Sequence, residues 1–520
     1  MKNIGYCLSL IIGMALASSA ALGSPIKIES GAIEGEQVGG LRIYRGVPYA
    51  KAPVADLRWR EPQPVEPWKG VHQATRFAPA CMQTGVSMPG EVPPAVSEDC
   101  LFLNIWAPSR VAATPLPIIV WIHGGAYNNG SASMPLYHGD RLAHKGVIVI
   151  TVAYRLGVLG FLAHPELTLE SAHHGSGNYG LMDQIAALEW VQRNAAAFGG
   201  DPQQVTIAGQ SSGAISVSAL MASPRAKGLF HRAIAQSGGL FEPKQLGRGY
   251  LLENAERDGE KYAASLGISS LKELRQRPAV DFLGSGASAI AHPVFEPYVL
   301  PETPYEVFTS GRQNDVPLLL GSNADEARSL TDVTAVKATT FAADLERSFG
   351  PLPPALATAY AYGTDEEARE ARLGLERDLR FGWDMWAWAR LHAGSSKNHV
   401  YYYAFNQHPP FPADSVYAGW GASHFAELWY VFDHLDQESW RWSEADRHLS
   451  QVMSDYWVNF ARTGNPNAPG LPAWPAFTGT DANVMHLGGQ TGVGGVANLT
   501  QLRIFDDVYS AVRGKPFAAR

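Results

Sequence analysis

The 520-residue sequence predicts an α/β fold with a mostly parallel central sheet flanked by helices. Several short runs are rich in β-branched residues, and helical patterns separate them. The runs are nearly continuous in apolar residues rather than alternating, which is typical of strands buried on both faces of a parallel sheet. Strands that alternate with helices predict an α/β arrangement. Strands are expected at residues 117–123, 147–154, 205–209, 233–235, 316–321 and 400–405.

The helical patterns and the remaining segments complete this prediction. Apolar residues recur at helical spacing in residues 183–194 and, more weakly, in 212–221. Residues 26–68 contain short strands with Pro-rich turns, which predicts an antiparallel edge. Residues 251–375 are helix-rich and charged, so a helical cap over the sheet is expected there. Because no repeat, low-complexity tract or linker divides the rest, residues 24–520 are predicted to form a single domain.

Composition excludes several classes of protein. Lys and Arg number 41 against 49 Asp and Glu, giving a net charge of −8, and there are only 3 Cys. This balance is ordinary for a globular protein and excludes disordered, collagen-like and disulfide-dense chains. Mild acidity without a long basic run argues against a nucleic acid partner. No cofactor or metal is predicted, because the sequence has neither clustered His/Cys ligand spacing nor a nucleotide-binding glycine loop.

Residues 1–23 have the pattern of a secretory signal peptide. Lys2 precedes an apolar run, which ends in small residues, and cleavage after Ala20 or after Gly23 fits equally well. The alternatives are a buried N-terminal helix or a membrane anchor, but the run is short for a span of about 20 residues. No later stretch is long and apolar enough to cross a bilayer. The chain is therefore predicted to be exported, to the periplasm or the extracellular space, without a membrane segment in its mature form.

Removal of that segment leaves Cys81 and Cys100. An exported chain with two cysteines most simply forms one disulfide, and the alternative is two unrelated buried thiols. Closing the intervening Pro- and Gly-rich loop would stabilise the fold by about 3 kcal/mol in the chain-entropy model.

The sequence GQSSG at residues 209–213 lies between a predicted strand and a predicted helix. In such a strand–turn–helix elbow the glycines permit a tight turn that exposes Ser211 as a nucleophile. A helix that begins at Ser212 directs free N–H groups toward developing negative charge. The five-residue pattern alone has little specificity, so the prediction depends on its position in the chain.

A second motif, HGGA at residues 123–126, follows a predicted buried strand. Successive small residues allow backbone N–H groups to approach a substrate oxygen, as an oxyanion hole requires. The alternative is a simple glycine turn. The elbow makes the oxyanion hole the favoured interpretation.

With these motifs the chain resembles the type B carboxylesterases, the α/β-hydrolase family that includes the cholinesterases. The resemblance implies an α/β-hydrolase fold with a helical cap and a disulfide between Cys81 and Cys100. It covers nearly the whole mature chain. The matching stretches are GVPYA (46–50), SEDCLFLN (97–104), YRLGVLGF (154–161), GNYGLMDQ (177–184), FGGDP (198–202), QSG (236–238), WVNFA (457–461) and TGNPN (463–467).

An elbow of this type needs an acid and then a histidine downstream. The 16 His and 49 acidic residues leave many candidates. The resemblance assigns Glu326 and His424, with Asp325 as the neighbouring rival for the acid. A buried structural histidine is the alternative for His424.

The resemblance also implies that the N–H groups of Gly125, Ala126 and Ser212 bind the oxyanion. Ser211 would attack an ester carbonyl, and His424 would accept and return the proton. Glu326 would fix the imidazole tautomer.

The resemblance also implies structural roles for several charged residues. The family's equivalents of Arg58 and Glu98, and of Arg155 and Asp183, form buried ion pairs. Glu427 and Ser237 are expected to support the site as a polar network.

Three departures from the family narrow the substrate. Gln210 and Ser212 replace the common Glu and Ala of the elbow, and Ala126 replaces the third glycine of the oxyanion loop. Residues 82–99 contain no aromatic residue, whereas the cholinesterases place there a Trp that faces a quaternary ammonium. A cholinesterase is therefore rejected. A group of aromatics is considered for the pocket, with core packing favoured for most of them: Trp383, Trp386, Trp388, Tyr417 and Trp420.

The predicted function is that of a serine carboxyl-ester hydrolase acting on a small-molecule ester. The alternatives are a lipase or a specialised esterase for feruloyl, tannin-like, mycotoxin or polyester substrates. A non-enzymatic binding module on the same fold is disfavoured because all three triad residues are present. Acyl and alcohol specificity and oligomeric state do not follow from the sequence.

Overall fold

The computed structural model describes residues 21–517 except residues 87, 89, 90, 111, 285 and 351. Residues 1–20, most of the predicted signal peptide, lie outside the described residues. Within the described part, no helix is long and apolar enough to cross a membrane.

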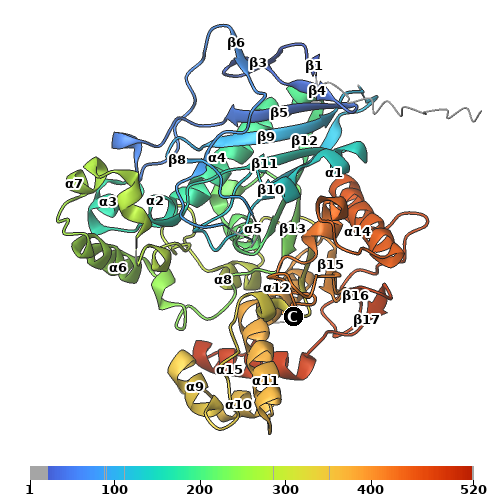
Figure 1. The fold of residues 1–520 in the computed structure, drawn as a ribbon. Helices are drawn as coiled ribbons and strands as arrows, with labels where there is room; N and C mark the ends of the chain where they lie inside the picture. Colours follow the sequence, from blue (N-terminus) through green and yellow to red (C-terminus); the bar gives the residue numbers. More distant parts are fainter. Residues whose placement is uncertain are drawn as a thin grey trace, which may run out of the picture.

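A large mixed sheet forms the centre of the molecule (Figure 1). Seven parallel strands occupy its middle in the order β11-β10-β12-β13-β14-β15-β16. The α/β prediction is confirmed, and each of the six expected strands is present. The seven parallel strands, of which β16 was not expected, are β10 (Leu116–Ile122), β11 (Ile148–Val152), β12 (Gly200–Gln210), β13 (Arg232–Gln236), β14 (Leu318–Asn323), β15 (Val400–Phe405) and β16 (Val484–Leu487).

Antiparallel strands extend both edges of this sheet. Beyond β11 lie β9 (Phe102–Pro108), β5 (Leu41–Pro48), β4 (Glu36–Val38) and β1 (Ala21–Leu22), and beyond β16 lies β17 (Gly492–Gly494). The expected antiparallel N-terminal edge is therefore present. Part of that segment instead joins a separate sheet of β2 (Ile26–Ile28), β3 (Gly31–Glu34) and β6 (Val71–Gln73). A small pair comprises β7 (Ala80–Cys81) and β8 (Val96–Ser97).

Helices cover both faces of the sheet, which explains the continuous apolar runs. Along β10, Val120 and Ile122 belong to one core cluster and Ile119 and Trp121 to another, because successive strand residues point to opposite faces. On one face lie α4 (Tyr179–Asn194) and α5 (Ser212–Ala222). On the other lies α14 (Glu444–Thr463).

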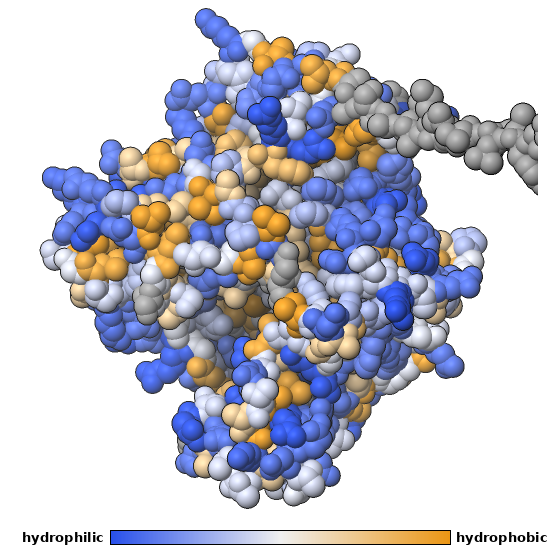
Figure 2. Space-filling view, in the orientation of Figure 1, coloured by the Kyte–Doolittle hydropathy of each residue, from blue (hydrophilic) through white to orange (hydrophobic). Residues whose placement is uncertain are grey.

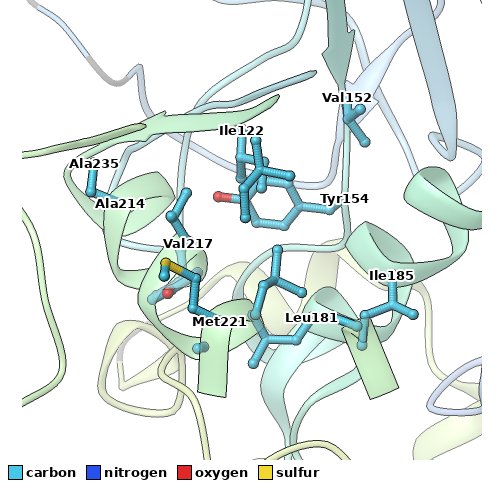
Figure 3. Close-up of a cluster of buried hydrophobic side chains, with 14 of the residues drawn as sticks. Ile122, Val152, Tyr154, Leu181, Ile185, Ala214, Val217, Met221 and Ala235 are labelled. Carbon is cyan, nitrogen blue, oxygen red and sulfur yellow. The ribbon is translucent and has the colours of Figure 1, made fainter. Parts of the chain in front are cut away.

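Figure 3 shows the core on the first of these faces, where Ile122 and Ala235 of the sheet meet helical side chains. Leu181 comes from α4, and Val217 and Met221 come from α5; all are at most 1% exposed. This packing holds the start of α5 against the ends of the central strands.

The helix-rich segment after β13 contributes to a lobe at one end of the molecule. In Figure 1, α9, α10, α11 and α15 gather at the end opposite β1 and β4.

The space-filling view shows mostly hydrophilic side chains on this face of the molecule, with scattered apolar ones (Figure 2). The other helices are α1 (Asp140–His144), α2 (Gly157–Phe161), α3 (Pro165–Glu170), α6 (Leu252–Ser265), α7 (Leu271–Gln276), α8 (Pro304–Thr309), α9 (Phe341–Phe349), α10 (Pro354–Ala359), α11 (Asp365–Arg377), α12 (Trp383–Ser395), α13 (Leu428–Val431) and α15 (Leu499–Arg513).

A disulfide and two ion pairs join separate segments of the chain. Cys81 and Cys100 form a disulfide. Arg58 contacts Glu98 at 2.7 Å. Arg155 holds Asp183 of α4 through two contacts of 2.7 Å, and both side chains are at most 3% exposed.

Removing Asp183 tests how much the buried ion pair contributes to stability. We expect Asp183→Ala to lower the free energy of unfolding by about 3–5 kcal/mol, because Arg155 is left as an unpaired buried charge. Glu29→Ala breaks a solvent-exposed pair with Arg193 and should cost at most about 1 kcal/mol. Chemical denaturation of both variants measures the difference, and equal small losses would contradict the assignment.

Candidate functional site

Ser211 occupies a sharp turn between β12 and α5. Its backbone has φ 58° and ψ −129°, a left-handed conformation that side chains rarely adopt. Its N–H donates to the Gln236 carbonyl at 2.8 Å, and its carbonyl accepts from Ile215 at 3.0 Å. These bonds on both sides hold the strained residue in place.

The glycines of the elbow are required by close approach of the backbone. A Cβ on Gly209 would lie 2.5 Å from the Gly213 carbonyl, and one on Gly213 would lie 2.1 Å from the Ile122 oxygen. Any side chain at either position would force the strand and the helix apart. The motif therefore specifies the turn itself.

Three backbone N–H groups beside Ser211 have no acceptor among the described residues: those of Gly125, Ala126 and Ser212. Gly125 and Ala126 have φ of 108° and 52°, which turns this loop sharply after β10. The Ser212 hydroxyl accepts from the Tyr127 N–H at 3.3 Å and so ties this loop to the start of α5. The two segments together present free donors to one space.

His424 is held in a buried position by Glu326. Its Nδ1 lies 2.5 Å from Glu326 Oε2, and Glu326 Oε1 accepts from the Asn323 N–H at 2.8 Å. Phe381 stacks on the imidazole with ring centroids 4.6 Å apart. Glu326 begins the turn that follows β14, so the sheet places it opposite the loop that carries His424.

Asp325, the rival acid, has other partners. Its carboxylate contacts His408 at 3.0 Å and Arg328 at 3.2 Å, and it accepts from the Ala422 N–H. The two adjacent acids thus point to different places, and of the two it is Glu326 that contacts His424.

Gln210 makes a contact that sequence reasoning missed. Its side-chain nitrogen lies 3.2 Å from His424 Nε2 and 3.5 Å from Nδ1, and the residue is 2% exposed. The departure from the family pattern was visible in the sequence. Its contact with the imidazole was not, because 214 residues separate the two.

A cavity of about 660 Å³ brings these groups together. Ser211, His424 and the three free N–H donors all line it, whereas Glu326 lies behind the imidazole. The aromatic lining was not predicted from the sequence and comprises Tyr127, Tyr137, Tyr250, Phe349, Phe381 and Phe425.

The aromatic residues first considered for the pocket do not line this cavity. Trp383, Trp386 and Trp388 are at most 2% exposed and pack in the core, and Tyr417 and Trp420 pack against a second core cluster. Core packing, the favoured alternative, is their observed role.

Behind the imidazole lies a buried polar network centred on Glu427. Its carboxylate accepts from Gln236 at 3.0 Å and from Asn323 at 2.5 Å. Burial, reinforced by the charge of Glu326, raises the pKa of Glu427 to about 7. The expectation that Ser237 joins this network was wrong: among the described residues its buried hydroxyl has no hydrogen-bond partner.

The raised pKa of Glu427 predicts a pH dependence of stability. Between pH 4.5 and 7 the native state holds a proton that the unfolded state has lost, so the free energy of unfolding falls as pH rises. This contribution amounts to about 3 kcal/mol and should be complete by about pH 8. Denaturation at pH 5 to 8 should show a smaller decline for Glu427→Gln than for the wild type. Parallel profiles would contradict the shift.

A family model described as the carboxylesterase family matches residues 23–504. Fumonisin B1 esterase of Sphingopyxis macrogoltabida is 35% identical over 90% of this chain and 86% of its own length. Para-nitrobenzyl esterase of Bacillus subtilis strain 168 is 35% identical over 87% of this chain and 92% of its own.

Solved structures agree with these matches. A PNB esterase structure superimposes with a TM-score of 0.79 at 33% identity, covering 92% of this chain and 99% of that one. A thermophilic PNB esterase gives a TM-score of 0.80 at 32% identity with the same coverage.

Proposed function

Because the chain belongs to the carboxylesterase family and is a carboxylic ester hydrolase, we propose that it hydrolyses small-molecule esters through an acyl-enzyme on Ser211. The main support is that one cavity is lined by the strained serine, the Glu326-bound imidazole and three unpaired N–H donors.

The proposed reaction begins with attack by the Ser211 hydroxyl on the ester carbonyl. His424 Nε2 accepts the hydroxyl proton and passes it to the departing alcohol. Glu326 accepts a hydrogen bond from Nδ1–H, which places the proton-accepting lone pair on Nε2 and stabilises the imidazolium. A water molecule then attacks the acyl carbonyl and gives a proton to His424, which returns it to the Ser211 oxygen as the acyl–oxygen bond breaks.

The negative charge that develops on the carbonyl oxygen needs donors fixed in advance. The N–H groups of Gly125, Ala126 and Ser212 supply them, and the positive end of α5 adds to their field. Donors that do not reorganise during the reaction stabilise the tetrahedral intermediate more than water does.

A general carboxylesterase is the favoured assignment, and a specialised esterase for a mycotoxin is the second. The second is supported by 35% identity to fumonisin B1 esterase. A comparison of p-nitrophenyl acetate with fumonisin B1 separates the two: a kcat/KM at least about 100-fold higher for the toxin would favour the specialised enzyme.

Replacing the nucleophile tests the proposal. We expect Ser211→Ala to reduce hydrolysis of p-nitrophenyl acetate-to-octanoate esters by at least about 10³-fold. Ser218→Ala removes a hydroxyl from the same helix that bonds only to the Ile215 carbonyl, and should retain activity. Circular dichroism verifies that both variants fold. Equal activity of Ser211→Ala and wild type would refute the acyl-enzyme.

Gln210→Glu tests the contact between the amide and the imidazole. A carboxylate beside His424 favours the protonated ring, so the base becomes available only at higher pH. We expect the acidic limb of the kcat/KM profile to move up by about one pH unit. Gln210→Met removes the amide without adding charge and should leave that limb in place. A superimposable profile for Gln210→Glu would show that the side chain does not face the working base.

We further propose export of the chain, supported by its N-terminal pattern and by the Cys81–Cys100 disulfide. N-terminal sequencing of protein produced in a bacterial host should begin at residue 21 or 24. An N-terminus that retains Met1 in a cytoplasmic fraction would contradict export.

A further inference from the structure

Two carboxyl groups that line the active-site cavity have no role in the proposed reaction. Glu242 follows β13, Asp384 lies in the first turn of α12, and both side chains line the cavity with Ser211. Burial and then the charge of Glu242 raise the pKa of Asp384, and both carboxylates add to the rise that burial causes in the pKa of Tyr250.

The backbone places these carboxyls near the elbow. Gly238 packs against Ser211, since a Cβ there would lie 2.3 Å from the serine carbonyl. The next residue, Gly239, packs against Asp384, where a Cβ would lie 3.4 Å from the carboxyl carbon. One short segment therefore contacts both the serine and the Asp384 side chain.

Neither carboxyl is satisfied by the protein. Asp384 is 7% exposed, and its Oδ1 accepts one long hydrogen bond, 3.3 Å, from the Phe241 N–H. Among the described residues, neither its Oδ2 nor either oxygen of the partly buried Glu242 has a hydrogen bond or ion pair. Buried carboxylates are normally paired, so the free oxygens of Asp384 and of the partly buried Glu242 remain available as acceptors in the cavity.

One guanidinium, that of Arg513 in α15, acts on both carboxyls from a distance: its charge opposes the rise in their pKa values, but it forms no ion pair with either among the described residues. Arg513 instead donates to the Phe241 carbonyl and packs against the Tyr305 ring, 3.7 Å from its centroid. Burial raises the pKa of Asp384 well above its usual range, with Glu242 adding to the rise, and burial also raises the pKa of Glu242. An incoming cation would therefore displace a proton rather than break an existing pair.

We propose that Glu242 and Asp384 form a subsite for a primary or secondary ammonium group of the substrate, so that the enzyme prefers amine-bearing esters. This inference rests on the proposed function, because the subsite belongs to the same cavity. Carboxyl oxygens accept hydrogen bonds, so the subsite requires N–H donors. It differs from an aromatic site for a quaternary ammonium, which has no N–H to donate.

Binding of n-hexylammonium, compared with 1-hexanol and hexyltrimethylammonium, tests the subsite. We expect calorimetry to show binding of n-hexylammonium about tenfold tighter than of either comparator, because only this probe combines charge with N–H donors. The double variant Glu242→Gln/Asp384→Asn should bind all three equally. Asn is a near match for a protonated Asp384, so this variant should fold.

Glu376→Gln is the matched control. Glu376 also lines the cavity, but Arg372 and Arg380 already neutralise it at 2.8 and 2.7 Å, so the ammonium preference should persist. Equal binding of the three probes by the wild type, or a preference that survives in the double variant, would overturn the subsite.

Measurements on Ser211→Ala separate this inference from the proposed function, because binding requires no turnover. If the wild type binds n-hexylammonium preferentially but hydrolyses no ester, the acyl-enzyme is rejected and the subsite is kept. Hydrolysis without ammonium preference would reject the subsite alone.

Discussion

The strained backbone at Ser211 is the constraint on which the rest of the site depends. A serine with φ 58° persists only because a strand, a helix and the β13 segment fix it from three sides. Gly209 and Gly213 let those elements meet at distances that no side chain tolerates. The core beneath α5 supplies the packing that resists relaxation, so the exposed hydroxyl is positioned by the sheet rather than by its own contacts.

The imidazole is immobilised in a comparable way. Glu326 bonds to its Nδ1, Phe381 covers one face, and the Gln210 amide lies beside the ring. Because Gln210 directly precedes Ser211, the elbow positions both the serine and a neighbour of its base. Because this neighbour is a neutral amide, Glu326 is the carboxylate that contacts the imidazole.

The sequence predicted the parallel centre of the sheet well, because strands buried on both faces are apolar throughout. It did not predict β9, whose run is interrupted by Asn104. That residue is buried and satisfied: it accepts from the Gly46 N–H and donates to the Thr151 hydroxyl, partners 58 and 47 residues away. Such a polar residue resembles a break in a strand until its partners are known.

Within the site, local motifs specified the elbow and the oxyanion loop, but no local pattern joins Glu326 to His424. Their assignment came from family resemblance, and the contact forms because β14 and β15 are adjacent in the sheet. The cavity wall was beyond prediction for the same reason. Glu242 is far in sequence from Phe381 and Asp384, and their grouping depends on how α12 packs against the segment after β13.

The central claim is that Ser211 is the nucleophile of this cavity. Its most direct test is to treat the enzyme with diethyl p-nitrophenyl phosphate. The p-nitrophenolate released per chain is measured, and the labelled residue is located by peptide mass spectrometry. The account predicts one diethylphosphoryl group on Ser211, with loss of ester hydrolysis in proportion to labelling. A label on another residue, or full labelling with activity retained, would contradict it.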